Sequence, residues 1–182
     1  PIQTKWYRAA DETIPESWQQ SKSDWIIQVN NRSYCCHQII LGSGPRASNF
    51  FSSAFQQCSQ YPEGKNVTDL TQLLPEPCHG IWEMVLDFFY ASANFRCKTL
   101  FNFINVENVV PIYKLAQILR VKALAHACVH WLEKHLDHNT SFTILAAAVS
   151  LEPGLEMIEK VCTETIAMQI QICERDAFLG LD

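Results

Sequence analysis

Apolar residues in this chain are spaced as in β-strands near the N-terminus and as in helices over most of the remaining sequence. Residues 25–29, Trp-Ile-Ile-Gln-Val, form a short aromatic and β-branched run that is typical of a strand. Asn30 and Asn31 come next, and because Asn tolerates positive φ they indicate a tight turn. Residues 33–37 complete a predicted hairpin, while the apolar residues 38–41 fit either a strand or a helix.

Helical spacing begins after the break at residues 42–45, Gly-Ser-Gly-Pro. Ser48 is a suitable N-cap for the short helix that comes next. Phe50, Phe51 and Phe55 recur at helical spacing and give this helix an aromatic face. Residues of such a face pack into the core of the domain or contact another chain, and packing is the commoner outcome for any one of them.

After a predicted edge strand at residues 67–74, the chain is expected to form one helix after another. Proline is tolerated in the first turn of a helix, so Pro75 and Pro77 indicate a helix start. The helix that they begin is apolar nearly all round, which predicts a central position. The helices expected here, in chain order, cover residues 75–89, 109–119 with Asn108 as cap, 124–135, 140–149 with Asn139 as cap, and 155–172.

This order of elements predicts an α+β domain, in which a small β-sheet is clustered with helices, followed by an all-helical segment. The chain has 182 residues, of which 48% are hydrophobic and 18% charged, so it can bury a substantial core. Its net charge of −5 repels phosphate, which disfavours nucleic acid as a direct partner. We expect no membrane span, because no apolar run approaches the roughly 20 residues that a span requires.

The eight cysteines are scattered along the chain, and none of them forms a C-x-x-C pair. Cys35 and Cys36 are adjacent on a predicted strand, where neighbouring side chains point to opposite faces and make poor co-ligands for a metal. A chain of this size does not need disulfides to be stable. We therefore expect free buried thiols and a cytoplasmic or nuclear location.

Two arrangements of cysteine and histidine suggest chemistry and are disfavoured. His126 and His130 lie one helical turn apart, a spacing that can chelate zinc, but Cys128 falls on another side of that helix. Cys78 and His79 begin a predicted helix, where a thiolate is favoured, yet adjacent residues of a helix do not face each other. We expect no metal, no cofactor and no catalytic residue, and a cysteine-dependent enzyme is the disfavoured alternative.

Several residues succeed one another in an order that is typical of a known domain family. Asp24 precedes the first strand, His37 ends the second, and Ser48 stands three residues before Phe51. The later members of this series are Leu41, Phe55, Leu86–Tyr90, Leu115–Leu119, Leu124 and Cys128. On these residues, the segment 24–136 resembles the BTB/POZ domain.

The segment 137–182 resembles the beginning of a BACK domain, a helical module that comes after the BTB domain in kelch-type adaptors of cullin ubiquitin ligases. Asp176–Leu181 is similar to the linker between two helices of that module. The resemblance makes residues 1–23 an N-terminal extension associated with the dimer, and whether it exchanges between subunits stays open.

The resemblance to BTB/POZ proteins implies a homodimer and a face that binds a cullin scaffold. The candidate residues for the dimer interface are Phe50, Phe51, Phe55 and Trp25. The candidate residues for the cullin face are Trp82, Phe89 and Tyr90. The positions that carry the family pattern at the start of the domain are Asp24, His37 and Gln38.

Gln38 departs from the family pattern, because many members have Arg or Lys directly after the histidine. In the repressor branch that cation pairs with the residue equivalent to Asp24, so a repressor-type function is disfavoured here. The loop at 42–45 is also longer than usual. The resemblance thus implies a non-enzymatic homodimeric adaptor that brings an unknown substrate protein to a cullin-based ubiquitin ligase. The alternative is a BTB scaffold or transcriptional regulator that dimerises without binding a cullin.

Overall fold

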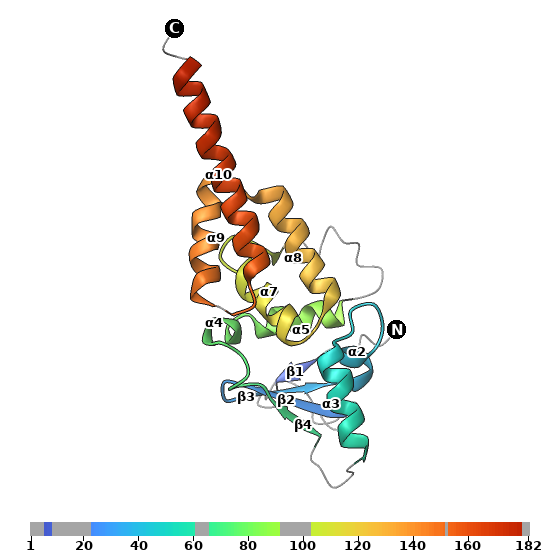
Figure 1. Cartoon of the computed structure of the whole chain (residues 1–182). Helices are drawn as coiled ribbons and strands as arrows, with labels where there is room; N and C mark the ends of the chain where they lie inside the picture. The colour runs from blue at the N-terminus through green and yellow to red at the C-terminus, as the bar shows by residue number, and fades with distance from the viewer. Residues whose placement is uncertain (1–5, 9–22, 61–65, 92–102, 152, 180–182) are drawn as a thin grey trace.

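The computed structural model describes residues 6–8, 23–60, 66–91, 103–151 and 153–179. A small sheet lies at one end of the molecule and helices α9 and α10 lie at the other, as Figure 1 shows. The C-terminal part of α10 extends beyond the other helices (Figure 1). The predicted α+β architecture, a small sheet clustered with helices and then a helical segment, is confirmed.

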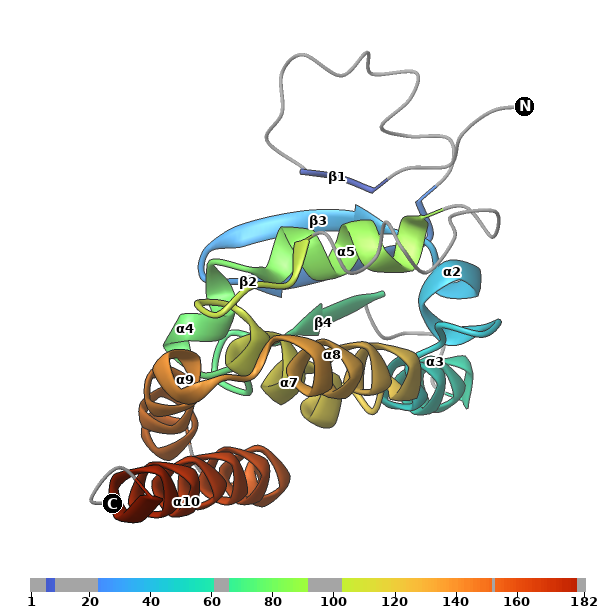
Figure 2. The ribbon, with the colours of Figure 1, turned by 90° about the horizontal axis from the view of Figure 1, so that it is seen from above.

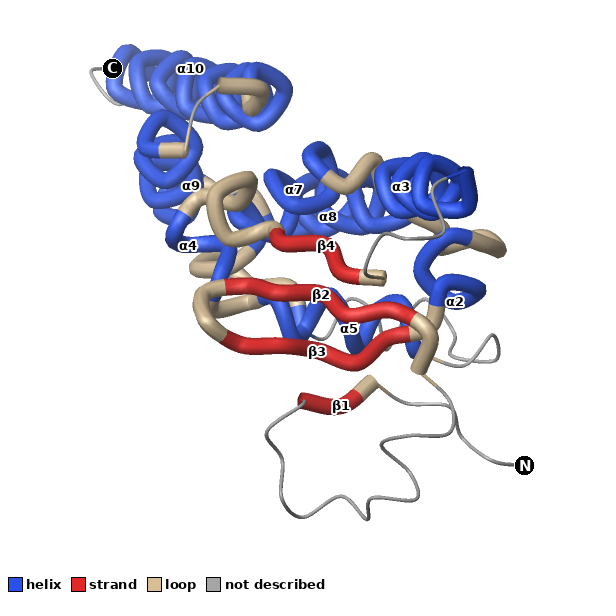
Figure 3. Tube along the Cα trace, turned by 90° about the horizontal axis from the view of Figure 1, so that it is seen from below, coloured by secondary structure: helices blue, strands red, loops and turns tan. Residues whose placement is uncertain are grey.

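Four short strands form one sheet in the order β1-β3-β2-β4. The predicted hairpin is at its centre, where β2 (Trp25–Val29) pairs antiparallel with β3 (Arg32–Cys36). β1 (Tyr7–Arg8) adds to β3 as an antiparallel edge strand, and β4 (Val67–Asp69) adds to β2 in parallel. Figure 3 shows β1 on the outer side of β3, at the opposite edge of the sheet from β4.

The central hairpin is explained by its sequence. Trp25, Ile27 and Val29 are buried while the two residues between them are half-buried, because alternate side chains of a strand point to opposite faces. Asn30 and Asn31 make the turn with φ of 47° and 63°, as predicted.

Residues 38–41 belong to a helix, α2 (Gln38–Gly42), rather than to a strand. Helix α5 lies across one face of the sheet (Figures 2 and 3). The last helix continues to Leu179, so residues 176–179, expected in a linker, are helical instead. The helices after α2 are α3 (Asn49–Gln60), α4 (Glu76–His79), α5 (Trp82–Tyr90), α7 (Val109–Ile118), α8 (Lys122–His135), α9 (His138–Ser150) and α10 (Glu156–Leu179).

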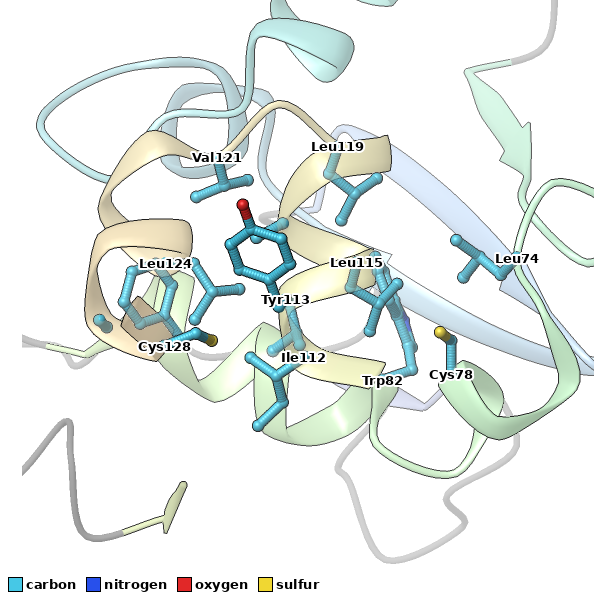
Figure 4. Packing of buried hydrophobic residues seen from close by; sticks show 14 of the residues in the cluster. Leu74, Cys78, Trp82, Ile112, Tyr113, Leu115, Leu119, Val121, Leu124 and Cys128 are labelled. Carbon is cyan, nitrogen blue, oxygen red and sulfur yellow. The ribbon is translucent and has the colours of Figure 1, made fainter. Parts of the chain in front are cut away.

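Helix α7 is more deeply buried than its amphipathic spacing predicts. Its first five residues are all buried, and five consecutive residues cover more than a full turn. In Figure 4 its side chains Ile112 and Leu115 lie among those of α5 and α8, including Trp82, Leu124 and Cys128. Burying a large apolar side chain of this kind contributes about 1.5–3 kcal/mol, so this cluster is a major source of stability.

Two predicted elements are shorter than expected. The strand predicted at 67–74 ends at Asp69, whose Oδ1 accepts a hydrogen bond from the Thr71 N–H at 2.8 Å and turns the chain. The helix predicted at 75–89 is divided at Gly80 into α4 and α5.

Two predicted helix caps are wrong. Asn108 precedes α7, but its Oδ1 accepts a hydrogen bond from the Asn105 N–H at 2.8 Å and none from the helix. Helix α9 is capped by Asp137 instead of Asn139. The Asp137 carboxylate accepts hydrogen bonds from the N–H groups of Asn139 and Thr140 at 2.9 and 2.8 Å, and a negative charge is favoured at that end of a helix.

The predicted Ser48 cap is confirmed, and it also joins two distant helices. Its side chain is fully buried, and Oγ accepts a hydrogen bond from the Phe51 N–H at 3.1 Å. The same hydroxyl donates to the Leu119 carbonyl at 2.6 Å, next to the end of α7. The start of α3 is thereby fixed to the end of α7.

Replacing Ser48 with Ala should lower the free energy of unfolding by about 1–3 kcal/mol, because two buried backbone groups lose a partner. Chemical denaturation followed by circular dichroism measures the change. The matched control is Ser53→Ala on the same helix, where the hydroxyl donates to the Asn49 carbonyl at an exposed position. That control should cost less than about 0.5 kcal/mol, and equal losses at the two positions would contradict the role given to Ser48.

Candidate interaction surfaces

Asp24 and Gln38 meet at the start of α2, through the backbone of residue 38. The Asp24 Oδ1 accepts a hydrogen bond from the Gln38 N–H at 2.8 Å. The carboxylate thereby satisfies one of the N–H groups at the helix start that have no partner within the helix. The side chain at position 38 takes no part in this bond. The aspartate therefore has a partner although no cation comes directly after His37.

His37 is buried and joins the start of α2 to the end of α5. Its backbone N–H donates to the Tyr90 hydroxyl at 2.9 Å, and its Nδ1 lies 2.9 Å from the same oxygen. Burial raises the pKa of Tyr90, so this hydroxyl stays protonated. The loop after α2 is fixed to the same end of α5. The Arg46 guanidinium donates to the Phe88 and Ala91 carbonyls there, where a cation is favoured by the helix dipole.

The candidate dimer residues lie mostly inside the chain. Trp25, Phe51 and Phe55 are 2%, 0% and 8% exposed, and they form one aromatic cluster. The Trp25 and Phe55 rings meet edge to face at 4.7 Å, and the Phe51 and Phe55 rings stack at 5.9 Å. Phe50 alone among the four is half-buried and offers surface to a partner.

The most exposed large apolar side chain near this cluster is Ile39 on α2, which was not among the residues predicted from the sequence. It is 73% exposed, whereas Leu41 of the same short helix is fully buried. The sequence does not indicate that Ile39 is exposed, because residues 38–41 fit either a strand or a helix. Once they form a helix, Ile39 and Leu41 point to different sides and only one of them enters the core.

The candidate cullin residues on α5 are also mostly internal. Trp82 is 0% exposed and Phe89 5%, and only Tyr90 is half-buried. The Trp82 Nε1 is buried and has no hydrogen-bond partner among the described residues. Trp82 and Phe89 therefore pack in the core and do not form part of the surface.

Acidic side chains form the outer surface of α5 and bind the N-terminal strand. Arg8 donates from Nε and Nη2 to the two carboxylate oxygens of Glu83 at 2.7 and 2.6 Å. The Tyr34 hydroxyl donates to the same carboxylate at 3.1 Å, and Arg32 lies 3.6 Å from it. The hydrogen bonds from Arg8 lower the pKa of Glu83, which Tyr34 and the two arginine charges lower further.

A second set of exposed apolar residues lies on the C-terminal helices. Phe142 and Val149 of α9 are 61% and 57% exposed and stand two turns apart on one side of that helix. On α10, Met168 and Ile170 are 64% and 54% exposed. The pair Phe142 and Val149 forms an exposed apolar side of α9, and such groups are typical of surfaces that contact other proteins.

Cys78 and His79, the adjacent pair considered for chemistry, do not face each other. Cys78 is fully buried, and burial raises the pKa of its thiol to about 12. Its neighbour His79 turns away, with Nε2 3.2 and 3.0 Å from the Thr71 and Leu74 carbonyls. Over the described ranges no group of three or more His, Cys, Asp or Glu side chains could hold a metal ion. The same part of the chain contains no helix long and apolar enough to cross a membrane.

Replacing Glu83 with Gln should reduce the unfolding free energy by about 1 kcal/mol at pH 7, since the ion pair with Arg8 is partly exposed. The pKa of Glu83 is lowered from 4.5 on folding, so its contribution is complete above that pH and is lost as the pH falls through the lower folded value. Denaturation curves between pH 3 and 7 should therefore converge for the two proteins at the acidic end. Glu107→Gln, at an exposed loop position, is the control; a difference that persists unchanged at pH 3 would contradict the role of the Glu83 charge.

Comparison with known proteins agrees with the fold. The family model of the BTB/POZ domain matches residues 15–136. Kelch-like protein 40b from Danio rerio is 22% identical to the chain over 162 residues. The match covers 87% of this chain and 22% of that relative, so the chain spans about a fifth of its length.

The resemblance to the BTB/POZ domain is therefore confirmed. The match extends from before β2 to the end of α8, which includes the central hairpin, the aromatic cluster and the buried helix α7. The chain belongs to the BTB/POZ domain family.

Proposed function

We propose that the chain is a homodimeric adaptor that brings a substrate protein to a cullin-based ubiquitin ligase, with no catalytic chemistry of its own. The proposal is supported by membership of the BTB/POZ family, by similarity to a kelch-like protein, and by exposed apolar side chains at two separate places. A dimeric adaptor needs two surfaces, one for its own copy and one for the scaffold.

The observation that carries the dimer proposal is the exposure of Ile39. The Ile39 side chain is 73% exposed on a short helix, so covering it with a second chain would stabilise a dimer. Ile40 of the same helix and Phe50 of the adjoining α3 are half-buried and extend the apolar surface. A two-fold axis through this surface would place α2 of one copy beside α2 of the other. Trp25, Phe51 and Phe55 would hold the two helices in position from inside.

The cullin surface is proposed at the junction of the BTB domain with the helices after it. Phe142 and Val149 offer an uncharged apolar strip on α9. Tyr90, half-buried beside His37 at the end of α5, would be a second, separate contact. We propose that residues 137–182 are the start of a BACK module and that residues 1–23 are an N-terminal extension. The buried free thiols support a reducing compartment, cytoplasm or nucleus.

Replacing Ile39 with Asp should weaken the dimer by at least tenfold, because a charge at the interface would be desolvated without a partner. Light scattering over a dilution series gives the mass of each protein. The matched control is Val149→Asp, which places the same charge at a similarly exposed apolar position on α9. A wild-type chain that stays monomeric at all concentrations would refute the dimer, and equal weakening by both variants would refute the assignment to α2.

Binding of the purified chain to cullin N-terminal domains tests the adaptor role. We expect a complex at micromolar concentration, measured by calorimetry. Phe142→Asp should weaken it by about tenfold or more, since large apolar side chains dominate such contacts, while Ile39→Asp should leave the cullin contact of each chain intact. If the chain forms no complex with any cullin, the adaptor proposal is wrong, and the alternative is a scaffold or regulator that dimerises without a cullin.

A further inference from the structure

The N-terminal strand β1 is bound like a short peptide at the edge of the sheet. Its two residues pair with β3, in the register Tyr7 with Cys35 and Arg8 with Tyr34. The residue before it, Trp6, places its ring edge-on against Tyr34 at 5.7 Å. Backbone pairing at an exposed strand edge, with side chains in neighbouring sites, is a general mode of peptide recognition.

The side chains of this segment fit two acidic positions on α5. Glu83 and Asp87 are one helical turn apart, so they lie on the same side of the helix. Arg8 makes two hydrogen bonds to Glu83, and the Trp6 Nε1–H donates to the Asp87 Oδ1 at 2.8 Å. Trp6 and Arg8 are two residues apart, which in an extended chain puts both side chains on one face. The site therefore selects an aromatic residue followed two positions later by arginine.

The contacts that hold this segment are easily exchanged. In the described part of the chain β1 pairs with the sheet over two residues, and the Arg8 and Glu83 side chains are 46% and 29% exposed. Ion pairs with this much contact to water are screened and contribute little to stability. The residues that contact Trp6 and Arg8 should keep their positions when this segment leaves, because Tyr34 is buried and Glu83 belongs to a helix of the core.

We infer that the outer edge of β3, together with Glu83 and Asp87, is a docking site for an extended segment of a partner protein with the pattern aromatic–x–arginine. Trp6–Arg8 occupies this site as a built-in competitor, and the partner segment binds when β1 leaves. The negative charge of the two carboxylates selects a basic segment, and the edge-to-face contact with Tyr34 selects an aromatic ring. The site is separate from Ile39 and from the exposed apolar side chains of α9.

The test uses the whole chain and a fluorescent peptide that copies residues 3–10, with binding measured by anisotropy. The double variant Trp6→Ala/Arg8→Ala opens the site and should bind the peptide with a Kd on the order of 100 µM. The wild type should bind about tenfold more weakly, because a tethered segment competes at an effective concentration on the order of 1 mM. Adding Glu83→Gln and Asp87→Asn to the opened chain should reduce binding by at least tenfold.

A second peptide, in which the arginine is replaced by glutamate, is the matched control and does not depend on how the receptor variants fold. It should not bind. Absence of saturable binding to the opened chain would overturn the proposal, as would equal binding of the two peptides. Light scattering separates a further outcome: a dimer that is lost in the opened variant would show that the site holds Trp6–Arg8 of a second copy, which also overturns the inference.

Discussion

Burial of helix α7 is the constraint on which the other helices depend. The first five residues of α7 are all buried, so neighbouring elements must cover its first turn on every side, while Gln117 near its end is exposed. Helices α4, α8 and α9 pack against α7, and the Cys78 thiol donates to the Pro111 carbonyl at its first turn. Ser48 fixes the start of α3 at its other end. The sheet-bearing part and the C-terminal helices are thereby joined through one element.

This arrangement explains why few of the aromatic residues that the structure describes remain exposed to partners. Trp25, Phe51, Phe55 and Trp82 fill the space between the sheet, α3 and α5, where each ring meets another. Burial likewise raises the pKa of the Cys78 and Cys128 thiols, which disfavours nucleophilic chemistry at these two residues. A few large apolar side chains remain exposed, and Ile39 is the most exposed of them among the described residues. This distribution favours function by binding.

Sequence reasoning predicted the elements better than it predicted the surfaces. The hairpin, its Asn30-Asn31 turn and the Ser48 cap depend on local preferences of the chain, and each is confirmed. The predicted Asn108 cap was wrong because the Asn108 Oδ1 accepts from the Asn105 N–H instead. The predicted Asn139 cap was wrong because α9 begins earlier, and the Asn139 N–H itself donates to the Asp137 carboxylate. Local spacing does not indicate these hydrogen bonds.

The resemblance indicates which elements face a partner, but neither it nor the spacing of aromatic residues tells the inner side of a helix from the outer one. Trp82 and Phe89 are internal, while the exposed Ile39 was hidden in residues that fitted either a strand or a helix. The contacts of Trp6 and Arg8 with α5 join residues 75 and more positions apart in sequence. No period or motif in the sequence indicates such pairs.

The central claim is that the domain acts through a self-complementary surface at α2. Amide hydrogen exchange tests it most directly, measured at one protein concentration above and one below the dissociation constant of the dimer. We expect the amides of residues 39–42 to exchange more slowly in the concentrated sample, because a second chain covers α2. Amides of α7 and of α9 should exchange at the same rate in both samples, since one is already buried and the other faces elsewhere. Exchange at α2 that does not change with concentration, with slowing at another surface, would contradict the claim.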